Sequence, residues 1–371
     1  MSDRETKKLR QGFTTGTAAA AAVKAALVYL FTKQVPGSVK INLLNDQILD
    51  ILVDSVSPHN GLVRAVVVKD AGDDPDITHR ARIGAVVGLT DDPGMVQIAG
   101  GKGVGLVTKP GLEVPPGEPA INPGPRKMIR ESALQVLNTY HSNAGVSAEI
   151  FVENGEALAE KTLNRRLGIE GGLSILGTTG LVKPLSHEAY TATIRSAMSV
   201  ARACGCDHVV LTTGRRSERF SQTFFTDLYE LHPEAFIQIG DFFGMSMECL
   251  AENKIPNATL AVFFGKALKM AQGFAHTHAA KSDLTMDWLS DVVKEETGNN
   301  TLTREVLNAN TARHAFGMLW PGYPRVLEKV GAAMIRAAER FCPAPCRFRA
   351  IIYDFQGVVA FDSHENEHKH N

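Results

Sequence analysis

The chain has 371 residues, of which 44% are hydrophobic and 21% are charged, a balance typical of a folded globular protein with two domains. Its formal charge of −1 excludes a global electrostatic attraction for nucleic acid or for an anionic membrane surface. Five cysteines, an odd and unevenly spaced set, indicate free thiols of a reducing compartment and not a disulfide framework.

The first half reads as a helix followed by short strands. The N-terminus lacks the apolar region of a secretory signal, and no later run approaches the ~18 uninterrupted apolar residues of a membrane span, so we expect a cytoplasmic protein without a membrane partner. Alanines after Thr15 and Thr17 predict a helix over 13–31. Turn residues separate β-rich runs that predict antiparallel hairpins at 39–44, 47–56, 62–69, 83–89, 95–99 and 104–108. A helix with proline at its start follows over 125–140.

The second half alternates between strand and helix, which predicts βαβ units and a parallel sheet. The predicted strands are 207–212, 235–239 and 258–264, and the predicted helices are 218–231, 244–251, 266–272, 283–296, 303–316 and 323–341. A final hairpin is expected from 348–353 and 358–361. The fold class is therefore an α+β domain with a mostly antiparallel sheet over 1–165, an α/β, Rossmann-like domain over 166–344, and a disordered tail over 363–371. The hairpin region 345–362 is expected to return to the first domain.

The triplet Thr-Thr-Gly occurs at Thr14–Gly16, Thr178–Gly180 and Thr212–Gly214. The first copy precedes the alanine helix, where free N–H groups favour an anion, although a capped helix packed in the core fits equally well. The other two follow apolar runs that look like buried strands, and Asp241 follows the next strand at a similar level. Because ligands of open α/β sheets lie outside the carboxyl ends of the strands, these turns are expected to converge on one pocket.

Two further segments carry polar groups in irregular structure. The turn Gly72–Thr78 holds Asp73, Asp74 and Asp76, whose oxygens suit a divalent cation, ribose hydroxyls or an amine, or simply a solvated turn. The proline-rich stretch 109–127 cannot form regular structure, and a stiff loop of this length in a compact domain is usually functional. It contains Lys109, Asn122 and Arg126.

The pair His276 and His278 has no third ligand nearby in the sequence, so hydrogen bonding or proton transfer is favoured over metal binding. A structural role for either imidazole stays open. The cysteine spacings do not match a zinc knuckle, and we expect no metal site. The glycines at 100–105 lead into a β-run and not a helix, so they predict a hairpin and not a nucleotide-binding loop.

Taken in order, several segments resemble the CbiD-type cobalt-precorrin-5B C1-methyltransferases, over roughly residues 9–355. The matching segments are Gly12–Thr17, Gly72–Thr78, Gly103–Leu112, Gly117–Pro123, Arg166–Gly180 and His276–His278. Each is weak alone, but the ordered set is specific. The chain departs from the pattern at Arg80, Gly124 and Ala19, where glycine, valine and cysteine are expected.

The resemblance implies methylation of C1 of cobalt-precorrin-5B to give cobalt-precorrin-6A, in the oxygen-independent branch of cobalamin synthesis. It implies S-adenosylmethionine as the methyl donor, cobalt only as part of the substrate, and a fold unlike other tetrapyrrole methyltransferases. The candidate residues are then His276 and His278 for catalysis; Asp73, Asp74, Asp76, Thr178, Thr179, Gly180, Thr212, Thr213, Gly214 and Asp241 for the donor; and Thr14, Thr15, Gly16, Thr17, Lys109, Asn122 and Arg126 for the substrate.

Two other readings stay open on the residues alone. One is a nucleotide-dependent oxidoreductase, which the βαβ half would suit but for which no dinucleotide fingerprint is in place. The other is a non-catalytic corrinoid-binding protein, which the same carboxylate-binding groups would serve. The expected partner is a small tetrapyrrole, and a homo-oligomer or transient contact with other pathway enzymes is also left open.

Overall fold

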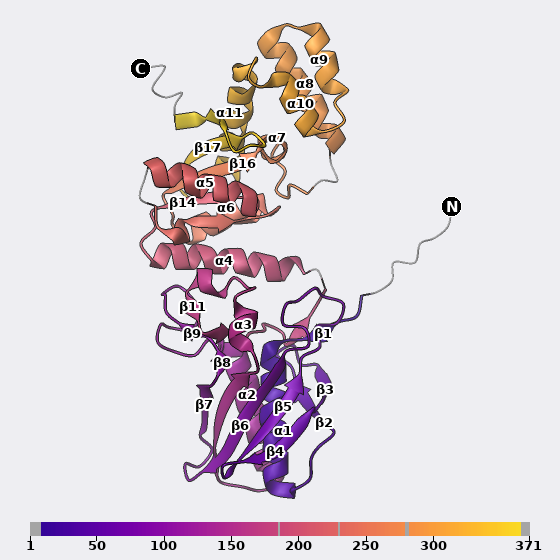
Figure 1. Cartoon of the computed structure of the whole chain (residues 1–371), viewed down its shortest axis with the longest axis vertical. Coiled ribbons are helices and arrows are strands. Elements are labelled where there is room, and N and C mark those ends of the chain that lie inside the picture. The colour runs from indigo at the N-terminus through magenta and orange to yellow at the C-terminus, as the bar shows by residue number, and fades with distance from the viewer. Residues whose placement is uncertain (1–8, 185, 229–230, 279–281, 365–371) are drawn as a thin grey trace, which may run out of the picture. The chain divides into compact units, whose positions relative to one another are not determined.

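The computed structural model describes residues 9–184, 186–228, 231–278 and 282–364. The chain folds into two compact units, Met1–His187 and Glu188–Asn371, which combine helices with several sheets (Figure 1). The domain boundary predicted from the sequence lies after residue 165. Residues 169–182 instead belong to the first unit because their short strands pair with strands of that unit.

The first unit is built on a mixed five-stranded sheet of order β4-β5-β6-β10-β7, in which only β10 and β7 run parallel. Its strands are β4 (Ser55–His59), β5 (Leu62–Val68), β6 (Arg82–Thr90), β7 (Val96–Gly100) and β10 (Gly145–Val152). Four two-stranded pieces surround it, formed by β1 (Gly12–Phe13) with β13 (Leu181–Val182), β2 (Ser38–Asn42) with β3 (Ile48–Leu52), β8 (Gly103–Val104) with β12 (Gly172–Leu173), and β9 (Leu106–Val107) with β11 (Ile169–Glu170).

Helix α1 (Thr15–Thr32) is the core of this unit and packs against β5, β6 and α2 (Pro123–Thr139) (Figure 1). Thr14 caps it by accepting a hydrogen bond from Thr17 N, and Lys33 ends it in a left-handed conformation with φ 59°. The alanines Ala18–Ala22 have 0% exposure, since small side chains let the helix approach the sheet closely on all sides. Among described helices, α1 alone has the length and composition to cross a membrane, but 67% of it is buried in the protein.

Two strand expectations in this unit need correction. The strand β10, which pairs with both β6 and β7 inside the sheet, was not predicted. The single strand expected over 47–56 is two strands, because the chain leaves the β2–β3 pair at Val53 and Asp54 before joining β5. The small helix α3 (Gly155–Ala159) and the turn η1 (Asn164–Leu167) complete the unit.

The second unit contains a sheet of order β15-β14-β16-β17-β18, parallel except for the last pair. The strands are β14 (His208–Thr212), β15 (Phe236–Gln238), β16 (Asn257–Phe263), β17 (Arg347–Tyr353) and β18 (Val359–Asp362). The helices are α4 (His187–Ala203), α5 (Arg215–Leu228), α6 (Phe243–Glu252), α7 (Phe264–Ala271), α8 (Ser282–Thr297), α9 (Asn300–Leu307), α10 (Ala312–Leu319) and α11 (Pro324–Phe341), with a short turn η2 (Pro233–Ala235).

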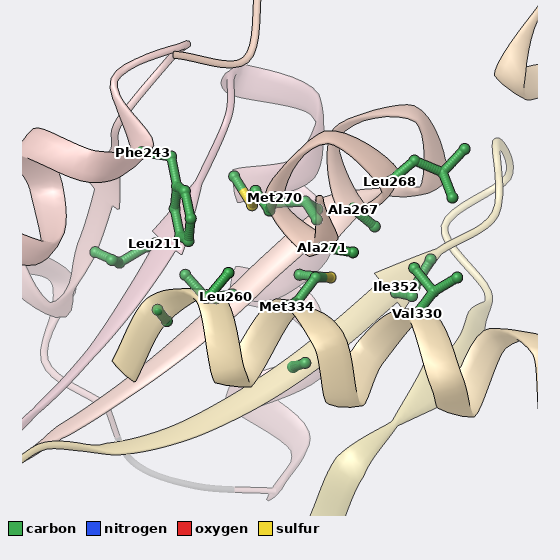
Figure 2. Packing of buried hydrophobic residues seen from close by; sticks show 14 of the residues in the cluster. Leu211, Phe243, Leu260, Ala267, Leu268, Met270, Ala271, Val330, Met334 and Ile352 are labelled. Carbon is green, nitrogen blue, oxygen red and sulfur yellow. The ribbon is translucent and has the colours of Figure 1, made fainter. Parts of the chain in front are cut away.

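Both faces of this sheet are covered, as expected for parallel strands. On one face Leu211, Leu260 and Ile352 pack against side chains of α6, α7 and α11, including Phe243 and Met334 (Figure 2). On the other face the alternate residues, Val210, Ala261 and Ile351, form a separate cluster with Phe225 of α5. The alternation of side chains along each strand therefore assigns one layer of helices to each face.

The structure corrects the expected partner of the final hairpin. β17 pairs in parallel with β16, in register from Asn257–Arg347 to Phe263–Tyr353, so the hairpin extends the second sheet and not the first. Two helix expectations also change: α4 was missed, and the helix expected over 303–316 is α9 and α10, separated where Thr311 caps α10. Most of the tail predicted to be disordered lies outside the described residues, although Ser363 Oγ accepts a hydrogen bond from Ala350 N.

Candidate active site

The start of α1 is enclosed by the loop that carries Thr178–Gly180. Thr14 N donates to the Gly180 carbonyl at 3.0 Å, and Gly16 N donates to the Leu176 carbonyl at 3.1 Å. Thr17 Oγ1 donates to Gly180 O at 2.7 Å, and Leu176 N donates to Thr15 Oγ1 at 2.9 Å. The threonines at 14, 15 and 17 are all buried. In this structure the helix start therefore anchors a loop: Thr14 N and Gly16 N donate to loop carbonyls, and Thr17 N donates to the hydroxyl of the capping Thr14.

The acidic turn also makes contacts within the first unit. Asp73 Oδ2 accepts from Arg10 N at 2.7 Å, and Asp76 Oδ2 lies 2.5 Å from Nζ of Lys69, whose side chain is 1% exposed. Asp76 Oδ1 accepts hydrogen bonds from the backbone and hydroxyl of Thr78, each at 2.7 Å. Burial acts to raise the pKa of Asp76, but Lys69 and Thr78 outweigh burial and lower it. The turn is thus an ion-pair network that fixes the N-terminal strand.

The proline-rich stretch 109–127 is not irregular throughout, because its last residues, including Arg126, form the first turn of α2. Two of its predicted binding groups hold the segment in shape. Arg126 Nε donates to the Ile121 carbonyl at 2.8 Å and its guanidinium lies 3.2 Å from Glu118. Asn122 Nδ2 donates to Glu113 Oε2 at 2.9 Å. Lys109 packs its methylene chain over Gly168. A Cβ on Gly168 would lie 2.4 Å from Cγ of Lys109. These contacts stiffen the loop, and a role of any of the three in binding substrate stays a prediction.

In the second unit, polar groups gather at the carboxyl ends of neighbouring strands. Thr212 ends β14, Asp241 follows β15, and Lys266 lies in the first turn of α7, directly after β16. These strands are adjacent and parallel, so their carboxyl ends lie along one edge of the sheet. This is the position at which open α/β sheets bind ligands.

Asp241 is the centre of a hydrogen-bonded network at this edge. Its Oδ1 atom contacts the ammonium group of Lys266 and accepts a 3.3 Å hydrogen bond from Thr277 Oγ1. Thr277 N donates to the Asp241 carbonyl at 2.8 Å, and Lys266 Nζ donates to the Thr277 carbonyl at 2.9 Å. Burial acts to raise the pKa of Asp241, but the hydrogen bond and charge of Lys266 lower it below its ordinary value. Asp241 is therefore a carboxylate at neutral pH.

An aromatic wall stands beside this carboxylate. The rings of Tyr190 and Phe242 are stacked with centroids 5.1 Å apart, and His276 meets the Phe242 ring edge-on at 4.9 Å. Burial, and then the charges of Asp241 and Glu218, raise the pKa of Tyr190, so its hydroxyl stays protonated. Gly240 makes room for this hydroxyl: its φ is +54°, and a Cβ there would lie 2.7 Å from the oxygen.

Replacing Gly240 with alanine should therefore destabilise the second unit by about 1–2 kcal/mol, because a side chain in the left-handed region is strained and must also displace Tyr190. Urea unfolding followed by circular dichroism would measure the change. Gly317→Ala is a matched control, since a Cβ on Gly317 meets nothing within 4 Å. Equal stability of the wild type and Gly240→Ala would contradict the assigned contact.

His276 and His278 extend from the network without being buried in it. Thr277 between them has 0% exposure and is held by Asp241 and Lys266, whereas both imidazoles are exposed. Their ring centroids are 6.3 Å apart. Within the described ranges, no group of three or more His, Cys, Asp or Glu side chains is arranged to hold a metal ion. The edge thus presents two exposed imidazoles on either side of the buried, hydrogen-bonded Thr277.

Two further polar groups lie at the same edge. Thr212 has 0% exposure, and its hydroxyl has no hydrogen-bond partner among the described residues. A buried hydroxyl of this kind is normally satisfied by an ordered water or by a ligand. On β15, Gln238 Nε2 donates to Glu218 Oε2 at 2.7 Å, which holds the buried carboxylate of α5 against the sheet.

The comparisons with known proteins agree with the ordered motifs. A model of the CbiD family matches residues 2–184, and a model of the CbiD C-terminal domain matches residues 276–364. A cobalt-precorrin-5B C(1)-methyltransferase of Geobacillus sp. (strain WCH70) is 45% identical, over 85% of this chain and 86% of its own length. The enzyme of the same name from Agrobacterium fabrum is 42% identical, over 95% and 92%. The chain belongs to the CbiD family.

A crystal structure of the cobalamin biosynthesis protein CbiD from Archaeoglobus fulgidus is also similar to this CbiD chain. It is 29% identical and covers 72% of this chain and 81% of the crystallised one, with a TM-score of 0.41. The resemblance predicted from the ordered motifs is thus confirmed by family models and by relatives that match most of the chain.

The predicted site residues of this CbiD chain are divided between its two structural units. Asp241, Thr212–Gly214, His276 and His278 belong to the second unit, where the network joins Asp241 to the histidine segment. The expectation that Thr178–Gly180 lies at the same sheet edge is wrong, because Leu181–Val182 pairs with β1 in the first unit. Lys266, Thr277 and Tyr190 were missed. The position of Lys266 directly after a predicted strand was a signal for it, whereas Tyr190 lies on the unpredicted α4.

Proposed function

We propose that this chain transfers a methyl group from S-adenosylmethionine to C1 of cobalt-precorrin-5B, giving cobalt-precorrin-6A. Relatives that match most of the chain carry the name of this methyltransferase, and membership of the CbiD family supports the same activity. The observation that carries the proposal within the molecule is the network of Asp241, Lys266 and Thr277, which holds two exposed histidines at the carboxyl edge of a parallel sheet.

The donor is proposed to bind at this edge. A carboxylate that follows the second strand of a parallel sheet suits the hydroxyl groups of a ribose, and Oδ2 of Asp241 is not used by Lys266 or Thr277. The sulfonium centre carries a positive charge, for which the stacked rings of Tyr190 and Phe242 provide an aromatic face. The unpartnered hydroxyl of Thr212 supplies a further hydrogen-bonding group among the described residues.

The reaction itself requires little covalent chemistry from the protein. The nucleophilic ring carbon forms a bond to the methyl group as the bond from sulfur to that methyl breaks, leaving S-adenosylhomocysteine. Alignment of the two reactants can contribute several kcal/mol, up to roughly 7–11. His276 and His278 are proposed to accept a proton from the ring or to hold one of its carboxylates, because both are exposed and flank Thr277, which is hydrogen-bonded to Asp241.

Binding of S-adenosylhomocysteine, measured by calorimetry with NADH as the comparison ligand, tests the donor site. The isosteric change Asp241→Asn should weaken binding by about tenfold, because it converts charge-assisted hydrogen bonds into neutral ones. Asp207→Asn is the matched control, since Asp207 precedes the amino end of β14 and is 71% exposed. Equal affinity for Asp241→Asn and wild type would remove Asp241 from the donor site. Binding of NADH alone would refute the methyltransferase.

A further inference from the structure

A cavity of about 570 Å³ lies in the helical layer of the second unit, at the end of α7 and between α8 and the C-terminal half of α11. One side is apolar and consists of Ala271, Trp288 and Ala333. The other side is charged and is formed by Arg336, Glu339 and Arg340. The volume falls in the ~300–1,000 Å³ range of small-molecule sites. We call this cavity the α11 pocket.

Among the residues that the structure describes, the two arginines of the α11 pocket have no hydrogen-bonding or ion-pair partner. Arg336 and Arg340 are four residues apart on α11, both are exposed, and neither makes a hydrogen bond or ion pair with another described residue. Like charges at this spacing on a helix destabilise it. Two guanidinium groups against the single carboxylate of Glu339 leave the lining positively charged. The arrangement is unfavourable in isolation and suited to an anion.

The backbone links the α11 pocket to the proposed active site. Gly273 has a φ of +78°, and a Cβ there would lie 2.7 Å from a guanidinium nitrogen of Arg340. This glycine therefore leaves room for Arg340 beside the chain. The same segment continues directly to His276 and His278, and Gly244 N fixes it by donating to the Ala275 carbonyl at 2.8 Å.

We propose that the α11 pocket binds a carboxylate-bearing side arm of the tetrapyrrole substrate. Arg336 and Arg340 pair with the carboxylate, while Trp288, Ala271 and Ala333 contact the methylene part of the arm. A guanidinium presents two parallel N–H donors that match a carboxylate, and a half-buried indole provides apolar area beside them. The inference rests on the proposed function, since the macrocycle is the source of the carboxylate.

Uroporphyrin, a stable tetrapyrrole polycarboxylate, is a practical probe of the α11 pocket. Its fluorescence anisotropy on titration with the full chain gives a dissociation constant. The double change Arg336→Gln with Arg340→Gln should raise that constant about tenfold or more, the loss expected for charge-assisted hydrogen bonds. Arg325→Gln is the matched control, because Arg325 is an exposed arginine of α11 outside the cavity lining. Circular dichroism verifies that each variant is folded.

A second readout distinguishes the possible outcomes. The chain has two tryptophans, so a Trp320→Phe variant leaves Trp288 as the reporter, and uroporphyrin should quench its emission. If the double arginine variant binds uroporphyrin with wild-type affinity, the proposal is overturned. It is also overturned if this variant loses S-adenosylhomocysteine binding but keeps uroporphyrin binding, because the pocket would then bind the donor. Arginine-dependent uroporphyrin binding by a chain that neither binds S-adenosylhomocysteine nor methylates would retain the pocket and refute the proposed function.

Discussion

Replacing His276 and His278 together with alanine is expected to lower methyl transfer by about 100-fold or more, the effect typical of removing a general acid or base. The affinity for S-adenosylhomocysteine should stay within about twofold of wild type, because the donor is proposed to contact Asp241 and not the imidazoles. Both side chains are exposed and Thr277 between them carries the network, so the fold should persist. Single-turnover assays with radiolabelled donor would measure the effect.

The control for this experiment is His314→Ala. His314 is an exposed histidine on α10 of the same unit, and its backbone N–H, which alanine retains, makes the capping contact with Thr311. Turnover of this control should match wild type. Undiminished turnover of the double variant would remove both imidazoles from the mechanism. The single variants His276→Ala and His278→Ala would divide the effect. If only one of them loses turnover, the proton-transfer or carboxylate-binding role belongs to that residue alone.

Replacing Asp76 with alanine is expected to destabilise the first unit by about 3 kcal/mol, because it leaves the ammonium group of Lys69 buried without its partner. Lys69 is 1% exposed, whereas Asp76 is 27% exposed, so the loss should fall at the lower end of values for broken buried pairs. Thr78 would lose its acceptor as well. Urea unfolding of both proteins at pH 7 would measure the difference.

The same pair predicts a pH dependence. The folded state lowers the pKa of Asp76 from an ordinary 3.8, so folding favours the ionised carboxylate. Its contribution to stability is present above the ordinary pKa and is lost as pH falls through the lower folded pKa. The difference in free energy of unfolding between wild type and Asp76→Ala should therefore shrink on acidification below about pH 4. A difference independent of pH would contradict the ion pair.

Two further variants separate charge from packing in this prediction. Asp50→Ala removes an exposed carboxylate of β3 in the same unit and should change stability little. The double change Lys69→Met with Asp76→Asn removes both charges and should recover most of the loss, because an uncompensated buried charge is the main cost. Failure of the double variant to recover stability would contradict the unpaired ammonium group as the main cost, because asparagine keeps an oxygen that can accept from Thr78.

The sequence determined the features of this protein that depend on neighbours along the chain. Alanines after a threonine cap predicted α1, because capping and helix propensity are local. Alternating strands and helices predicted the parallel β14, β15 and β16, because short βαβ connections leave few alternatives. The ordered motifs identified the CbiD family without any structure. Asp241 was named as a site residue because it follows a predicted buried strand, and the histidine pair because two imidazoles lie together between two predicted helices.

Only the tertiary structure decided which distant segments pair. On local grounds the threonines at the start of α1 could bind an anion. In the structure, carbonyl oxygens of the loop at 174–180 accept the hydrogen bonds of Thr14 N and of the Thr15 and Thr17 hydroxyls. The final hairpin could have joined either sheet on local grounds, and its pairing with β16 depends on register over the whole of β17. Likewise, the contact of Asp241 with Lys266 and the cavity beside Arg336 and Arg340 arise from packing of separate elements. Such pairings are set by burial and hydrogen bonding between residues far apart in sequence, which no local pattern records.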